Sequence, residues 1–236
     1  MRLACGFPLY PGGSDNSVKV LNNVAANGDV ALFNHLVDRG ADPHKSLALH
    51  YTSKCADSSK AVAMLSNLLD KHGMNINADT DDLRKFFHDA QDSGTPLCSA
   101  VFHKSMAVIE ELLRRGASPE MCGATGHPPA SKAIGNILFE GFFPALGPLL
   151  KAGADPDSAL ETAVRGGKID AINVCLVYGA NVDKGLEIAY EMEHDRLAEI
   201  ASESGERGEN WLKADEAAKE RCKAVVTFLA ETKIKN

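Results

Sequence analysis

Short apolar stripes at helical spacing recur along this chain, and each pair of stripes ends at a glycine. The segment 95–119 shows this pattern in its clearest form. Its first stripe consists of Leu97, Ala100 and Val101, and its second consists of Val108, Ile109, Leu112 and Leu113. Residues three and four positions apart share a helix face, so this spacing predicts two short helices with a break near Lys104 and Ser105.

Local signals define both ends of this helix pair. Thr95 is placed to cap the first helix, and Pro96 suits its first turn, where a backbone N–H would be unpaired in any case. Arg114 and Arg115 suit the negative end of the second helix, and Gly116 supplies the positive φ that ends it. We therefore expect a helical hairpin that cannot bury both of its faces alone and must pack against similar neighbours.

The glycine-terminated pattern occurs six times, which indicates a repeat architecture. The six glycines are Gly40, Gly73, Gly116, Gly153, Gly179 and, in a degraded copy, Gly205. Successive glycines are separated by 33, 43, 37, 26 and 26 residues. A sequence that repeats itself at such intervals folds as a stack of similar units, because each unit buries its apolar surface against the next.

The motif TPLCSA at residues 95–100 resembles the TPLHxA signature of ankyrin repeats, and the GADP endings at 40–43 and 153–156 are similar to that family's helix-to-hairpin junction. The resemblance covers residues 17–205. It implies an all-α, ankyrin-like repeat solenoid of about six helix pairs, with short or missing hairpin fingers in the last repeats, where the interval falls to 26. Cys98 stands where the family usually has a histidine that hydrogen-bonds between loops, so we expect other contacts to hold the stack at that point.

The segments outside the stack have their own patterns. Residues 1–16 read as an irregular leader, and residues 206–236 read as a long C-terminal helix that caps the last repeat. The apolar stripe of that helix consists of Trp211, Ala214, Ala218, Cys222, Val225, Val226 and Leu229. Its length and spacing predict one continuous helix.

Three irregularities interrupt the stack. The 43-residue interval holds about ten extra residues, and the spacing of its apolar positions predicts a short amphipathic helix over about 79–92. The polar segment 55–61 predicts a solvated loop. Pro148 lies too deep in the second helix of the fourth unit, where proline removes a hydrogen bond, so we expect that helix to be shortened or distorted.

Composition and charge exclude several classes of function. The net charge of −7 leaves no broad basic face for nucleic acid, and no apolar run approaches the roughly 20 residues that span a bilayer. The six cysteines lack metal-ligand spacing; their even number permits disulfides, but buried free thiols fit better. We expect a protein of the cytoplasm, with the nucleus as an alternative.

The sequence offers no recognised catalytic or cofactor motif. It contains no HExxH, no GxxxxGK[ST], no GxSxG and no GxGxxG, and the histidines lack ligand spacing. We expect neither a metal nor a cofactor. An acid–base role for His103, Glu140 and Glu191, with Arg165 holding an anion, is left as an alternative to a non-catalytic protein.

The ankyrin resemblance implies that a protein partner, which the sequence does not name, binds on the concave face. The family's recognition positions lie just before the turn into each second helix. In this sequence they are Phe102, His103, Phe139, Glu140, Arg165, Glu191 and Met192, with Thr52 and Ser53 in the second unit. Aromatic residues beside an arginine are typical of binding hot spots.

Two alternatives stay open at this point. One is a small-molecule binder or accessory enzyme that uses a groove in repeats 3 to 6. The other is a scaffold that associates with itself through the C-terminal helix.

Overall fold

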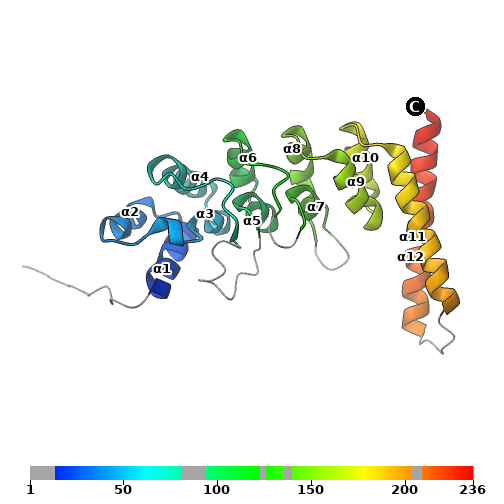
Figure 1. Cartoon of the computed structure of the whole chain (residues 1–236), viewed down its shortest axis with the longest axis horizontal. Coiled ribbons are helices and arrows are strands. Elements are labelled where there is room, and N and C mark those ends of the chain that lie inside the picture. The colour runs from blue at the N-terminus through cyan, green and yellow to red at the C-terminus, as the bar shows by residue number, and fades with distance from the viewer. Residues whose placement is uncertain (1–13, 81–93, 123–125, 136–139, 203–208, 236) are drawn as a thin grey trace, which may run out of the picture. The chain divides into compact units, whose positions relative to one another are not determined.

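The structure is a computed structural model, and it describes residues 14–80, 94–122, 126–135, 140–202 and 209–235 (Figure 1). Within these ranges the chain is all-helical, with twelve α-helices and no strand. One isolated antiparallel bridge joins Gly135 and Glu140. The expected all-α class is thus confirmed. The chain divides into two compact units, residues 1–128 (unit 1) and residues 129–236 (unit 2), which are described separately.

Unit 1 is built from three successive helix pairs. Its elements are α1 (Ser14–Asn27), α2 (Val30–Asp38), the short η1 (Pro43–Lys45), α3 (Ala48–Tyr51) continued by η2 (Thr52–Lys54), α4 (Ser58–Ser66) continued by the π-helix η3 (Asn67–Lys71), α5 (Pro96–Phe102) and α6 (Met106–Arg114). The first helices of the pairs pack in series, α1 on α3 and α3 on α5, and α4 packs on α6 (Figure 1).

Unit 2 repeats this arrangement and then ends differently. Its elements are α7 (Pro129–Ile134), η5 (Phe143–Ala145), α8 (Leu146–Lys151), α9 (Pro156–Arg165), α10 (Ile169–Val177), α11 (Val182–Ser202) and α12 (Glu209–Lys235). Helix α9 packs against both α7 and α11, and α8 packs against α10. The final pair consists of the two long helices α11 and α12 (Figure 1).

The helix ends follow the sequence signals. Thr95 caps α5, because its hydroxyl oxygen accepts a hydrogen bond from the backbone N–H of Cys98 at 3.3 Å. The five described repeat glycines have positive φ: Gly40, Gly73, Gly116, Gly153 and Gly179. A Cβ built at any of these five would meet no other atom within 4 Å. Glycine is therefore required there by the backbone conformation and not by lack of space.

The expected distortion at Pro148 is confirmed, and the structure shows how the chain accommodates it. The segment begins as the 3₁₀ turn η5 and becomes α-helical only at Leu146. Pro148 therefore lies in the first turn of α8, where its missing N–H is not needed. The consequence is a second helix of only six residues in this pair.

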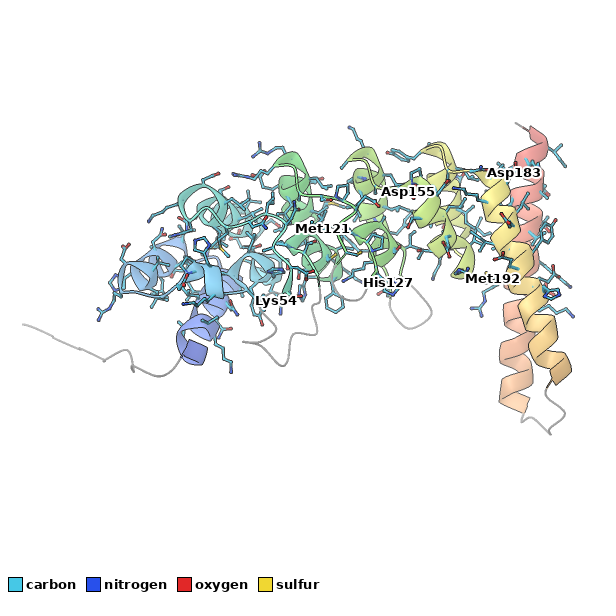
Figure 2. All side chains as sticks on the ribbon, viewed as in Figure 1. Lys54, Met121, His127, Asp155, Asp183 and Met192 are labelled. Atoms are coloured by element: carbon cyan, nitrogen blue, oxygen red, sulfur yellow. The ribbon has the colours of Figure 1, made fainter. Side chains whose placement is uncertain are left out.

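The last unit of the expected stack is not a helix pair with its own turn. Helix α11 runs without interruption from Val182 to Ser202, and Figure 2 shows Met192 in the middle of its unbroken ribbon. The expected turn after Glu191 and Met192 is therefore wrong, and α11 packs instead against α12. The reason is the absence of a helix breaker between Val182 and Ser202 apart from Gly185, which a helix tolerates.

Two inserted segments were also expected. The solvated loop over 55–61 is mostly wrong: Asp57 caps α4 by accepting hydrogen bonds from the N–H groups of Ser59 and Lys60, and Ala61 is fully buried. The amphipathic helix over about 79–92 falls on residues 81–93, which lie outside the described residues. No described helix is long and apolar enough to cross a membrane.

Candidate protein-binding surface

Five residues at two adjoining turns of unit 1 form the surface that we call the turn face. They are Tyr51, Lys54, Phe102, His103 and Lys104. The first two lie at the α3–η2 end and the other three at the turn between α5 and α6, and the two turns adjoin because η2 packs against α5. Figure 2 shows Lys54 at the edge of unit 1.

Phe102 is the most unusual member of the turn face. Its side chain is 51% exposed, although the six residues before it in α5 are all buried. The His103 ring stands edge-on to it, with the ring centroids 5.1 Å apart. The phenylalanine is therefore held in place on one side and open to solvent on the other, as a binding anchor must be.

The backbone of this turn is closely constrained. The N–H of His103 donates to the carbonyl of Ser99 at 2.9 Å, and the N–H of Ser105 donates to the carbonyl of Ala100 at 3.0 Å. Lys104 between them has φ of 57°, which makes it the one non-glycine residue with positive φ in the described part of the chain. Such a conformation costs about 1 kcal/mol or more and persists only where the surroundings enforce it.

Cations accompany the aromatic rings. The Lys54 ammonium lies 3.8 Å from the centroid of the Tyr51 ring, which is a cation–π contact. Lys54 and Lys104 are both exposed. The turn face thus combines an exposed apolar ring with positive charge, in a chain whose net charge is −7.

The two recognition positions expected in the second helix pair of unit 1 are wrong. Thr52 and Ser53 are buried, and their hydroxyls donate to the carbonyls of Leu49 and His50, both at 2.7 Å. These bonds satisfy carbonyls at the end of the four-residue helix α3, so the side chains turn inward. The next residue, Lys54, is the exposed one.

The described candidate residues of unit 2 lie on successive elements of the chain. Glu140 is exposed, and Arg165 is exposed at the end of α9, where it pairs with Glu161 at 2.9 Å. Glu191 is exposed and Met192 half-buried along α11. Phe139 lies outside the described residues.

One histidine that matters was missed by the sequence analysis. His50 is 2% exposed, and its Nε2 lies 3.1 Å from the carbonyl oxygens of both Ala78 and Gly94. These two carbonyls belong to the residues that flank the inserted segment. The N–H of Gly94 also donates to the hydroxyl of Thr80 at 2.9 Å. A buried histidine thus ties both ends of the insertion to α3.

Neither a metal-binding cluster nor a disulfide occurs among the described residues. They contain no group of three or more histidine, cysteine or carboxylate side chains that could hold a metal ion. The five described cysteines form no disulfide, and Cys98 and Cys175 are buried as expected. Burial raises the pKa of Cys175 to about 11, so its thiol stays protonated and unreactive.

The structure does contain an open cavity of ≈ 490 Å³ on the last helix pair. It is lined by Asp183, Leu186, Glu187, Tyr190, Ala230, Lys233 and Ile234. None of His103, Glu140, Arg165 or Glu191 lines it, so the alternative acid–base residues do not converge there. No protein-family model matches this chain, and a search of curated proteins finds no significantly similar sequence.

Proposed function

We propose that the chain is a non-catalytic protein-interaction module, an ankyrin-like stack of helix pairs that binds a protein partner through the turns into its second helices. The exposed Phe102, held at a constrained and positively charged turn, is the observation that carries this proposal. In unit 2, the corresponding turn positions are Phe139, Glu140 and Arg165.

The ankyrin-like assignment draws support from three local features. The TPLCSA motif begins a helix exactly where the family's signature would, with Thr95 as its cap. Five glycines with positive φ end five second helices. The first helices of neighbouring pairs pack on each other within each unit. These are the traits of a repeat stack in which each unit contacts only its neighbours.

The chemistry of the turn face favours an acidic partner segment that carries an apolar side chain. Lys54 and Lys104 attract carboxylates, and Phe102 offers a ring against which an aliphatic or aromatic residue can pack. Because the turn is already ordered, binding loses little backbone entropy there. Such a surface suits recognition of a protein or peptide better than enclosure of a small molecule, which needs a concave pocket.

Affinity capture from the native source, compared between the wild-type chain and a Phe102→Ala/Lys54→Glu double variant, tests the proposal. We expect at least one partner to be lost from the double variant, and to be retained by Tyr178→Ala, which removes a similarly exposed ring (42% exposed) from the C-cap of α10. Circular dichroism establishes that both variants remain folded. An identical set of captured proteins for all three chains would show that the turn face is not the binding surface.

No observation in the described residues favours the enzymatic alternative. His103 belongs to unit 1, Glu140, Arg165 and Glu191 belong to different elements of unit 2, and none of the four lines the open cavity. The proposal therefore includes no metal and no cofactor. The unpaired thiols agree with the proposed cytoplasmic location.

A further inference from the structure

The last helix pair of unit 2 carries an apolar hollow on the side that its neighbours leave uncovered. On α11, Gly185 faces α9: a Cβ placed there would be 3.1 Å from Leu160. Asp183, Glu187 and Tyr190 lie 140–200° around the helix from Gly185 at about 100° per residue, which is the opposite face. These three residues line the cavity of ≈ 490 Å³.

This hollow is unlike the outer surface of a simple end cap. A terminal repeat needs a polar outer face to remain soluble. Here the cavity floor includes Leu186 and Ala230, and its rim carries Tyr190 at 53% exposure and Ile234 at 85%. An aromatic and a branched aliphatic side chain exposed on either side of an apolar hollow indicate a surface that is covered in use.

The charges around the hollow are separated by helix. Among the residues that line the hollow, α11 contributes two carboxylates, Asp183 and Glu187. The charged residue that α12 contributes to the lining is Lys233, whereas Arg221 of α12 lies against Gly167. One half of the surface is therefore negative and the other half positive.

From this pattern we propose that the occupant is a second copy of this chain, so that α11 and α12 form a symmetric dimer interface. A surface with one acidic and one basic half is complementary to itself when it is related by a two-fold axis parallel to the helices. That axis sets α11 of one copy against α12 of the other. A two-fold axis across the helices would instead oppose the two acidic α11 helices, which charge repulsion disfavours.

The position of the residues along the helices agrees with this arrangement. The Lys233 ammonium lies 2.7 Å from the Asp183 carboxylate within one chain, so these two residues are at the same height on the antiparallel pair. A two-fold axis parallel to the helices preserves height. Glu187 of one copy therefore comes close to Lys233 of the other, while Tyr190 and Ile234 cover the hollow of the opposite copy.

The expected dimer is reversible and of moderate affinity. The half of the hairpin that carries these side chains is about 20 Å long, at 1.5 Å per residue, and two helices wide. That is smaller than a standard interface of roughly 800 Å² per partner. We expect a dissociation constant on the order of micromolar.

Sedimentation equilibrium of the full chain, from about 1 to 200 μM, tests the inference in a range that brackets such a constant. The apparent mass of the wild type should rise reversibly from the 25.2 kDa of one chain toward twice that value. Glu187→Lys and Lys233→Glu should each weaken the dimer at least tenfold, because each places like charges opposite one another at both symmetry-related positions. Mixing the two variants should favour a one-to-one heterodimer over either homodimer, because both pairs formed by positions 187 and 233 are again of opposite sign.

Matched controls separate the interface from a general effect of charge. Glu110→Lys on α6 and Lys60→Glu in the first turn of α4 make the same changes at exposed positions outside unit 2 and should leave the dimer intact. Ile234→Gln should weaken it without changing the charge. A wild type that is monomeric across the whole range would overturn the inference, and so would a dimer that survives Glu187→Lys, Lys233→Glu and Ile234→Gln alike.

Discussion

The two units join their successive helix pairs by different means. In unit 1, polar side chains cross between pairs: the Arg115 guanidinium donates to Asp70 at 2.7 Å and to Ser66 at 2.9 Å, and the Asn77 side chain accepts from the N–H of Ser118 at 2.9 Å. In unit 2, the helices themselves come close, and α9 contacts α11 where Gly185 leaves no side chain between them.

The difference follows from the length of chain between repeats. Unit 1 contains the longest interval, 43 residues, and the described segments at the ends of its insertion are held by hydrogen bonds to His50 and Thr80. These segments need their own hydrogen-bond partners, since buried backbone groups without partners are costly. In unit 2 the last two intervals shorten to 26 residues, the helices pack closely, and polar contacts run between neighbouring helices and their ends, as between Asp157 and both Asn181 and Lys184. Polar contacts from connecting chain thus occur in unit 1, whereas in unit 2 close apolar packing is accompanied by ionic and hydroxyl contacts between helix pairs.

The largest expected effect comes from the apolar contact in unit 2. Leu160 is fully buried and contacts the position of Gly185, so Leu160→Ala should destabilise the protein by about 3 kcal/mol through lost burial and the cavity left behind. Hydrogen exchange, measured by mass spectrometry on peptides from each unit, should become faster in this variant mainly in the peptides of unit 2.

A second substitution makes that prediction specific to close packing. In the wild type, Gly185→Ala gains about 1 kcal/mol of helix propensity but crowds Leu160, so its net effect should be small. In the Leu160→Ala background the crowding is gone, and Gly185→Ala should stabilise by about 1 kcal/mol. Denaturant unfolding of the two single variants and the double variant gives the free energy of unfolding of each. If the two changes in this free energy simply add, α9 and α11 are not joined by direct packing at Gly185.

The next effect concerns the polar contacts of unit 1. His50→Leu removes the donor from the carbonyls of Ala78 and Gly94, and the loss should cost about 2 kcal/mol because both oxygens lose a buried partner. The comparable change in unit 2, Ser131→Ala, removes a 2.8 Å bond between half-buried hydroxyls and should cost about 1 kcal/mol or less.

Thermal unfolding of the two variants provides the measurement, with His44→Leu as the control, since that side chain is exposed in the same unit. If His50→Leu costs no more than His44→Leu, polar anchoring of the inserted segment does not contribute to the stability of unit 1.

Much of the fold was accessible from the sequence because its signals are local. A cap, a proline in a first turn and a glycine with positive φ act within a few residues, so Thr95, Pro96 and Gly116 were assigned correctly from neighbours alone. The continuous helix α11 was missed because the spacing of glycines suggested another turn near Glu191, whereas no residue there breaks a helix.

The site depended on contacts that sequence spacing does not encode. Phe102 was selected correctly as a turn position, and its exposure could be known only from the packing around α5. Thr52 and Ser53 were chosen although the insertion in that helix pair breaks the regular count, and their hydroxyls cap the end of a short helix whose length the sequence does not reveal. His50 was overlooked because its partners, Ala78 and Gly94, are backbone carbonyls 28 and 44 residues away.

The smallest expected effect concerns the ion pairs at the end of α6 that hold Arg115, the residue that also reaches Asp70 of the preceding helix pair, and it depends on pH. Glu111 accepts hydrogen bonds from Arg114 at 2.7 Å and Arg115 at 2.6 Å, and its side chain is only 13% exposed. These bonds, first from Arg114 and then from Arg115, lower the pKa of Glu111 from 4.5 to about 2. A carboxylate whose pKa is lowered on folding stabilises the protein above its unfolded pKa, and this contribution is lost as the pH falls through the folded value.

Glu111→Gln should therefore be less stable than the wild type at pH 7, by about 1 kcal/mol, and the difference should shrink between pH 4.5 and about 2. Denaturant unfolding at a series of pH values measures it. The counterpart in unit 2 is Glu161→Gln, whose partner Arg165 is half-exposed (52%), so water and salt already weaken that pair and its removal should change little at any pH. If Glu111→Gln and Glu161→Gln lose the same free energy of unfolding at pH 7, the ion pairs of Glu111 stabilise the protein no more than ordinary surface pairs do. The contrast between the two units would then depend on His50 and the amide contacts alone.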